Sequence, residues 1–146
     1  MYRVRADTPE FLLVHPGGPV WKHKDEGIWS IPKGEIHPGE DVLAAAKREF
    51  EEELGLQAQG EFIELTPVVQ KSGKVVHAWG FAGDCDPSQM RSNTFAMEWP
   101  PRSGRMSTFP EVDRAAFFDL EQAKQRLYPA QLALLEELLH KLGRRS

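Results

Sequence analysis

Cysteine is almost absent from the chain, with only Cys85 among its 146 residues. One cysteine forms no intramolecular disulfide, and without a CxxC pair or a Cys/His cluster the sequence offers no zinc site. Long apolar runs are also missing, since none approaches the roughly 20 residues of a membrane-spanning helix. Residues 1–5 lack the apolar segment of a signal peptide. We therefore expect one cytoplasmic domain over residues 1–146, with no membrane contact.

An excess of positive charge is missing as well. The chain has 22 acidic residues against 18 Lys and Arg residues, a formal net charge of −4. This balance disfavours non-specific binding to a phosphate backbone, so nucleic acid is not an expected partner. It still permits a local cationic patch that holds a small phosphorylated ligand.

The first third of the chain predicts two short strands and one strong helix. Residues 11–14 (FLLV) and 28–31 (IWSI) are apolar runs halted by prolines, which is typical of strands. Between Asp41 and Leu54, apolar residues recur every four positions and form one stripe of a helix. Asp41 is its expected N-cap, and Gly55 is the expected left-handed residue after its end.

The middle of the chain has a strand-like pattern. A short strand is expected at 62–63, and the pairs 68–69 and 75–76 flank turn residues, which predicts a hairpin. Residues 77–81 would continue its second strand. Residues 84–110 are polar and contain four prolines, so we expect a long loop with one short strand at 95–99.

The last third predicts a strand followed by two helices. Residues 115–118 (AAFF) suggest the strand, and Asp119 would cap a helix that runs to about Gln125. Pro129 would open a second helix, whose leucine stripe is typical of core packing. Strands interleaved with one early helix and two late ones predict an α/β sandwich.

The early helix has an unusual acidic face. Glu49, Glu52 and Glu53 lie three and four residues apart, so they project from one side of the helix. Hard divalent cations prefer carboxylate oxygens, which makes this face a candidate metal site. A solvated acidic face, partly neutralised by the neighbouring Arg48, explains the same spacing equally well. Glu51 points away from the other three and fits that second explanation.

The segment from Gly34 to Leu56 also fits a longer pattern. The pattern is G-x5-E-x7-R-E-U-x-E-E-x-G-U, where U is apolar, and every specified position is satisfied. The matching residues are Gly34, Glu40, Arg48, Glu49, Phe50, Glu52, Glu53, Gly55 and Leu56. Seven fixed identities coincide by chance on the order of 10⁻⁸ times per window. The chain therefore resembles the Nudix hydrolases, whose signature is this box.

The resemblance implies an α/β/α sandwich with a mixed sheet, in which the usual first strand is shortened to residues 1–7. It implies hydrolysis of a nucleoside diphosphate linked to another group, with Mg²⁺ or Mn²⁺ at the pyrophosphate. By position, Glu49, Glu52 and Glu53 would bind the metal, together with a backbone carbonyl at or beside Gly34. A bound cation neutralises phosphate charge and lowers the pKa of a bound water.

The remaining box residues would support this chemistry. Arg48 would orient the glutamates by ion pairing, and Glu40 would support the site. The proton of the attacking water would pass to Glu53, Glu52 or a downstream acid. Glu111 is the first candidate for that acid, although a surface glutamate explains it equally well, and Glu98 is the second.

Residues outside the box bear on the substrate. Residues 29–34 (WSIPKG) resemble the W-x-x-P-K-G segment of diadenosine polyphosphate hydrolases, and residues 15–29 resemble a bacterial subgroup of predicted NTP pyrophosphohydrolases. Lys33 would contact a polyphosphate, and Trp29 is the candidate for contact with the nucleotide. The arginines at 91, 102 and 105 are expected to be simply exposed, and the five histidines share no ligand spacing.

Three classes of function remain open from these residues. The first is hydrolysis of a dinucleoside polyphosphate or a nucleoside triphosphate, and the second is hydrolysis of ADP-ribose or a nucleotide sugar. The third is a non-catalytic Nudix domain that binds a nucleotide, although such domains tend to lose box glutamates and none is lost here. Removal of an RNA cap is disfavoured by the acidic balance. The expected partner is a small nucleotide, bound by a monomer or a homodimer.

Overall fold

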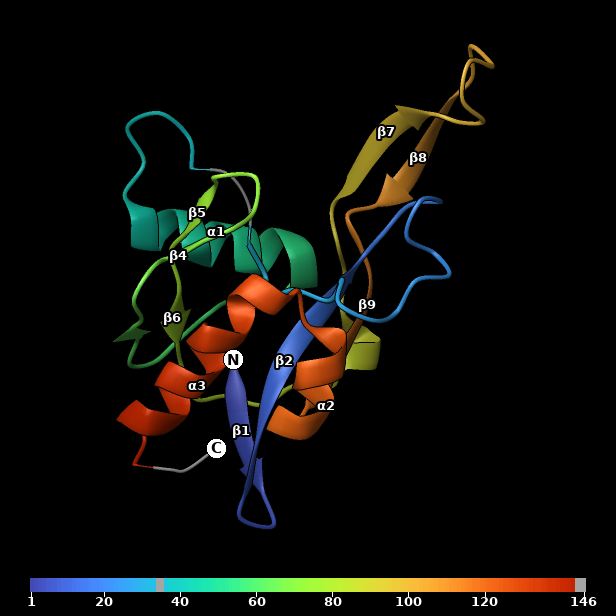
Figure 1. Ribbon diagram of the computed structural model, residues 1–146. Coiled ribbons are helices and arrows are strands. Elements are labelled where there is room, and N and C mark those ends of the chain that lie inside the picture. The colour runs from blue at the N-terminus through green and yellow to red at the C-terminus, as the bar shows by residue number, and fades with distance from the viewer. Residues whose placement is uncertain (34–35, 144–146) are drawn as a thin grey trace.

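The computed structural model describes residues 1–33 and 36–143 (Figure 1). Its central sheet has three antiparallel strands, in the order β1 (Tyr2–Arg5), β2 (Thr8–Pro16) and β9 (Val112–Phe118). The turn between β1 and β2 has Ala6 and Asp7 at φ 49° and 64°, the left-handed values of a tight two-residue hairpin. The first strand is therefore present, and it is short.

Helices cover both faces of this sheet. In the described residues they are α1 (Val42–Leu54), α2 (Leu120–Arg126) and α3 (Leu132–Lys141). Side chains of β2 alternate between two cores, as a pleated strand requires. Phe11 and Leu13 pack in the core that includes leucines of α2 and α3, whereas Leu12 and Val14 pack in the core that includes α1. Helices on both faces confirm the α/β/α arrangement. A parallel bridge between Tyr2 and Ala82 makes the sheet mixed.

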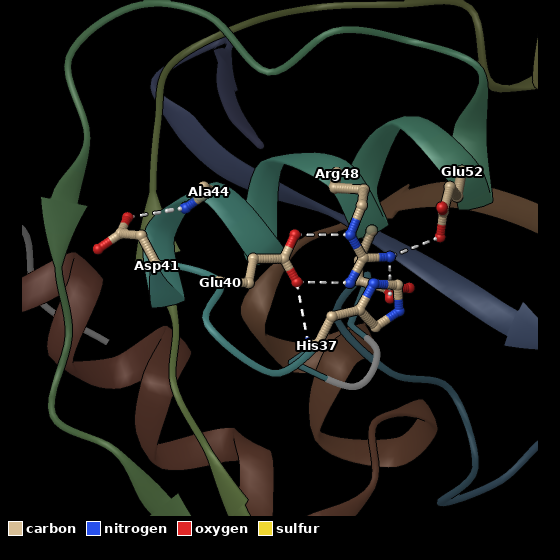
Figure 2. Close-up of polar contacts among 7 residues, drawn as sticks. His37, Glu40, Asp41, Ala44, Arg48 and Glu52 are labelled. Carbon is tan, nitrogen blue, oxygen red and sulfur yellow. Dashed lines mark hydrogen bonds and ion pairs between the residues drawn. The ribbon is translucent and has the colours of Figure 1, made fainter.

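Both ends of α1 lie where the sequence predicts. The Asp41 carboxylate accepts a hydrogen bond from the Ala44 N–H at 3.1 Å, as Figure 2 shows. Gly55 has φ 73°, and its N–H donates to the Glu51 carbonyl at 2.7 Å. Local capping therefore sets the length of the helix that carries the acidic face.

The middle of the chain forms short strands. They are β3 (Ile63–Glu64), β4 (Val68–Val69), β5 (Val75–Val76) and β6 (Trp79–Gly80). The hairpin of β4 and β5 is confirmed. The prediction that residues 77–81 continue β5 is wrong, because β6 pairs with β3 instead. The Leu65 N–H, which donates to the Ala78 carbonyl at 3.0 Å, holds this segment beside β3.

Of the long loop predicted at 84–110, the one short strand expected at 95–99 is confirmed as β7 (Thr94–Glu98). The rest is wrong as a loop, because the 3₁₀ turn η1 (Pro87–Gln89) precedes β7 and a second strand, β8 (Met106–Pro110), follows it. The two strands form an antiparallel hairpin that projects from the body of the molecule (Figure 1). Phe95 lies opposite Phe109, and their ring centroids are 6.1 Å apart.

The C-terminal third follows the prediction. Asp119 forms a capping box with Gln122 at the start of α2, and the turn η2 (Pro129–Gln131) leads into α3.

The strand expected at 28–31 is reduced to isolated bridges, of Ser30 with Val14 and of Trp29 with Leu127. No described helix is both long enough and apolar enough to span a membrane.

Candidate active site

The acidic face of α1 is partly buried. Glu49 and Glu53 are 8% and 9% exposed, whereas Glu51 on the opposite side is exposed. The helix places the first two carboxylates against the core that it shares with β2, so burial there costs free energy unless the charges are compensated. Solvation alone therefore does not explain the cluster.

Arg48 links three of the carboxylates. Its Nε and Nη2 donate to the two oxygens of Glu40 at 2.8 and 3.0 Å, the fork geometry of a bidentate pair. Its Nη1 donates to Glu49 and Glu52 at 2.8 and 3.0 Å, and Figure 2 shows Arg48 between Glu40 and Glu52. The hydrogen bonds from Arg48, and one from the His37 N–H, lower the pKa of Glu40 to about 2. The ion pair of Arg48 with Glu40 thus fixes the guanidinium that holds the carboxylates of Glu49 and Glu52.

Glu53 lies outside this network. One of its oxygens, Oε2, is buried and has no hydrogen-bond partner among the described residues. Burial raises the pKa of Glu53 to about 8; a backbone hydrogen bond from Lys33 opposes the rise, and the charge of Glu49 adds to it. A buried oxygen without a partner marks a position where a cation would be favourable.

Glu111 reaches the same region through backbone contacts. The Asn93 N–H donates to the Glu52 carbonyl near the end of α1 at 2.7 Å, and the Asn93 carbonyl accepts from the Glu111 N–H at 2.8 Å. Burial first, then the charges of Glu49 and Glu52, raise the pKa of Glu111. Four carboxylates from two separate segments are therefore close enough to influence one another.

A cleft of about 410 Å³ opens beside these carboxylates. Glu53, Glu111 and Lys33 all line it. The lining also includes polar and aromatic side chains, Trp21, Ser30, Gln70, Tyr128 and Gln131, besides apolar ones such as Val14, Ile28 and Val112. A wall that combines anionic, cationic and aromatic groups suits a ligand with both a phosphate and a ring.

Lys33 also borders a second hollow, of about 330 Å³, with Glu49, Lys74 and His77. Burial first, then the charge of Lys74, lower the pKa of Lys33, so the two ammonium groups lie near each other. Neither lysine forms an ion pair within the described residues. Two neighbouring cations beside a carboxylate cluster favour an anionic ligand that lies between them.

The whole arrangement corresponds to a known family. The family model described as NUDIX domain matches residues 2–138. The chain belongs to the NUDIX family.

Several NUDIX relatives have established names. The chain is 36% identical over 85 residues to the bis(5'-nucleosyl)-tetraphosphatase (asymmetrical) of Rattus norvegicus, an alignment that covers 53% of this chain and 52% of that protein. It is 43% identical over 66 residues to the RNA pyrophosphohydrolase of Rhodopseudomonas palustris, over 45% of this chain and 37% of that protein. The chain thus spans about half or less of the length of these relatives.

Solved structures support the fold. The chain superposes on a C. elegans Ap4A hydrolase in a binary complex with a TM-score of 0.62 and 23% identity, covering 97% of this chain and 92% of that one. At this identity the likeness shows a common fold and nothing finer.

The residues that the sequence singled out occupy different surroundings. Arg48 brings Glu40, Glu49 and Glu52 together on α1 and the turn before it, and Glu53 lies on the same helix outside that network. Gly34 lies outside the described residues. Trp29 is 3% exposed, and its ring packs edge-on against His15 and Phe118. Its indole therefore fills the core and does not line the cleft.

Other residues differ from their expected importance. Glu98 is exposed on the projecting hairpin and accepts a hydrogen bond from the Arg102 N–H. Sequence reasoning missed Lys74 and Gln131, which border the two hollows. Lys74 was assigned only to a turn, and a single glutamine at the start of a leucine-rich helix carries no signal of its own.

A divalent cation suits the chemistry of the NUDIX carboxylates. The oxygen of Glu53 without a partner, and the mutual repulsion of Glu49, Glu52, Glu53 and Glu111, would both be relieved by a hard cation. No three acidic, histidine or cysteine side chains among the described residues converge as a finished ligand set. Glu49 and Glu52 are instead held by Arg48, so binding would require these carboxylates to turn toward Glu53.

Proposed function

We propose that the chain is a pyrophosphohydrolase that cleaves a nucleoside diphosphate linked to a further group. The preferred substrate class is a dinucleoside polyphosphate or a nucleoside triphosphate. The observation that carries the proposal is the Oε2 of Glu53, buried without a partner in a cleft that also contains Glu111 and Lys33. The relatives named for tetraphosphate and RNA pyrophosphate hydrolysis support the same reaction type.

Glu49, Glu52 and Glu53 would hold Mg²⁺ or Mn²⁺, with the backbone carbonyl at or beside Gly34 that the family likeness implies. The bound cation would supply charge neutralisation at the pyrophosphate and a more acidic water. Arg48 and Glu40 act through the other glutamates, because their fork-shaped ion pair limits how the carboxylates turn.

Lys33 would hold the phosphates. Its ammonium is half-buried beside the carboxylates and has a lysine neighbour, so a polyphosphate anion would neutralise both cations. The position of Lys33 on the border of both hollows would allow phosphates to run between them. A ligand with a nucleoside at each end matches this arrangement better than a nucleotide sugar.

Among the four candidate bases, Glu111 is preferred here, since Glu98 is exposed on the projecting hairpin. Glu52 is ion-paired with Arg48, and Glu53 would be committed to the cation, whereas Glu111 has no ion pair within the described residues. Burial raises the pKa of Glu111, which makes its carboxylate a better proton acceptor. Glu111 would take the proton of the attacking water and hold it until product leaves.

The test is a product profile by chromatography with Mg²⁺ or Mn²⁺. The panel contains dinucleoside polyphosphates, nucleoside triphosphates, ADP-ribose, nucleotide sugars and 5'-triphosphorylated RNA. We expect release of a nucleoside monophosphate from at least one dinucleotide or triphosphate. Preferential turnover of RNA or of nucleotide sugars would replace the proposed substrate class, and no turnover of any compound would reject the enzyme.

Three variants separate the roles. Glu53→Gln and Glu111→Gln should each lower turnover by about 10²-fold or more, the usual effect of losing a ligand or a general base. Only Glu53→Gln should weaken Mn²⁺ binding, measured by titration without substrate. Glu51→Gln, on the exposed side of the same helix, is the matched control and should leave both unchanged.

A further inference from the structure

His15 is fully buried, and both of its ring nitrogens face hydrogen-bond acceptors. Nδ1 lies 2.6 Å from the Asp113 carboxylate, and Nε2 lies 2.6 Å from the Lys24 carbonyl oxygen. A carbonyl oxygen can only accept, and so can an ionised carboxylate, whereas a neutral imidazole has a single N–H. Both contacts are therefore hydrogen bonds only when the ring carries two protons.

This ring joins the two segments that flank the cleft. Lys24 belongs to the loop of residues 17–27, which also carries the cleft residue Trp21. Asp113 lies on β9, two residues after Glu111. The loop begins at Gly17, whose N–H donates to the Glu111 carbonyl at 2.9 Å. His15 thus holds the far end of the loop, while Gly17 holds its beginning.

The loop packs backbone against backbone at this point. A Cβ on Gly17 would lie 1.9 Å from the Pro110 carbonyl oxygen, so only glycine allows the approach. Any movement of the loop therefore acts directly on the turn that presents Glu111.

Around His15, each acidic side chain lies near a basic one. On β9, Asp113 accepts from His15, and its carboxylate is 3.8 Å from the Arg114 guanidinium, which itself lies over the ring of Trp29. On the loop, Asp25 accepts from the Trp29 indole and is ion-paired with Arg126 of α2. Asp113 is the one carboxylate in direct contact with the imidazole among the described residues, so it anchors the ring on β9.

We propose that His15 is a positioning residue whose two ring nitrogens hold the loop of residues 17–27 against β9, and with it Trp21, which lines the same cleft as Glu111. The bond from Nδ1 to the Asp113 carboxylate is charge-assisted and anchors the ring on β9. The bond from Nε2 to the Lys24 carbonyl is the one that holds the loop. The inference rests on the proposed function only in taking the cleft as the substrate site.

Two isosteric variants separate the two hydrogen bonds. The amide nitrogen of His15→Asn occupies the position of Nδ1, so this variant keeps the Asp113 bond and loses the Lys24 bond. The amide nitrogen of His15→Gln occupies the position of Nε2 and does the reverse. His15→Asn therefore tests the bond to the loop, and His15→Gln is its matched control.

Limited trypsin digestion measures the loop without requiring turnover. Cleavage after Lys22 and Lys24 is compared with cleavage after Lys71 in the β4–β5 turn, which corrects for differences in trypsin activity. We expect the ratio for His15→Asn to be roughly fivefold above wild type, as one lost hydrogen bond implies, and His15→Gln to match wild type.

Equal ratios for the two variants would overturn the proposal. Amide hydrogen exchange of the wild type needs no substitution, so it decides the matter even where a variant fails to fold: exchange of the Lys24 N–H, which donates to the Trp21 carbonyl, as fast as that of an unbonded amide would also overturn it. Where a substrate is turned over, KM should rise in His15→Asn more than in His15→Gln. A digestion result as expected in a chain that hydrolyses nothing would reject the proposed function alone.

Discussion

Glu53 combines two properties that conflict in a folded protein, a carboxyl group and a buried position. Its Oε2 has no partner among the described residues, and burial raises its pKa to about 8. A structural role would be filled better by an amide or an apolar side chain, since either avoids the cost of a buried charge. Without metal, the fold is therefore expected to be less stable with Glu53 than with an amide or apolar side chain at this position. Such a loss of stability is usual at a functional site.

This cost has a pH dependence whose direction follows from the two pKa values. Glu53 titrates near 4.5 when exposed and near 8 when folded, so protonation favours the folded state. The contribution is fully present below about pH 4.5 and is lost as the pH rises through about 8. We expect metal-free Glu53→Gln to melt at a higher temperature than wild type at pH 8.5, with the gap closing toward pH 5.

Thermal melts in excess chelator at both pH values measure this difference. Glu51→Gln, which replaces an exposed carboxylate on the same helix, should show no such change with pH. A Glu53→Gln protein that melts below wild type at pH 8.5 would mean that the Glu53 carboxylate already has a partner in the metal-free protein. It would contradict the assignment of Glu53 to a cation site.

Single residues were predictable when their role depends on the box alone. Arg48 was expected to orient the glutamates, and it contacts Glu40, Glu49 and Glu52. Trp29 was expected at the nucleotide, yet it fills the core, because tryptophan serves both purposes and spacing does not distinguish them. The two bonds of His15 reach a loop residue 9 positions away and a strand residue 98 positions away, which a linear pattern does not reveal.

At the scale of elements, α1 is the best-determined part of the fold and also the part that holds the chemistry. Asp41 and Gly55 limit it by local backbone rules, so the sequence predicted both ends. Its last turn is fastened to the segment 91–93, where the N–H groups of Arg91 and Asn93 donate to carbonyls of the helix. The two ends therefore differ, since only the second leads on to Glu111.

Substitutions at the two ends should separate stability from turnover. Asp41→Ala removes a capping bond and should cost about 1 kcal/mol of unfolding free energy. Gly55→Ala should cost about 1–2 kcal/mol because its φ of 73° is left-handed. Its Cβ would also meet the Arg91 carbonyl oxygen at 3.0 Å and displace the segment that positions Glu111.

We therefore expect Gly55→Ala to lower turnover as well as stability, and Asp41→Ala to lower stability alone. Urea unfolding and steady-state rates, taken where both variants are fully folded, measure the two effects. Equal losses of turnover would show that α1 stability, and not the placement of Glu111, limits the rate.

Elements without local signals were the ones missed. The strand β7 was expected, but its partner β8 was not, because Pro100, Pro101 and a long turn stand between them in place of a compact glycine turn. The pair of β3 and β6 depends on a contact between distant segments, whereas the expected continuation of β5 was the more local solution. Periodicity predicts which residues are apolar, and tertiary pairing decides where a strand stops.

At the scale of the molecule, β2 divides the interior into two cores, and each core supports different helices. Even-numbered side chains such as Leu12 support α1 and its acidic face, while odd-numbered ones such as Leu13 support α2 and α3. The sandwich was predictable because each layer must bury an apolar face. Its consequence for function is that equal damage to the two cores should have unequal effects on the site.

Leu12→Ala and Leu13→Ala test this asymmetry. Both side chains are at most 2% exposed, so each truncation should leave a cavity and cost about 2–5 kcal/mol of unfolding free energy. Leu12→Ala removes support from beneath Phe50 and Leu54, so α1 can shift and its carboxylates lose their alignment. Mn²⁺ affinity, measured by titration of the folded proteins at low temperature, should therefore fall in Leu12→Ala and remain near wild type in Leu13→Ala. An equal fall in both would mean that the metal affinity depends on overall rigidity and not on the core beneath α1.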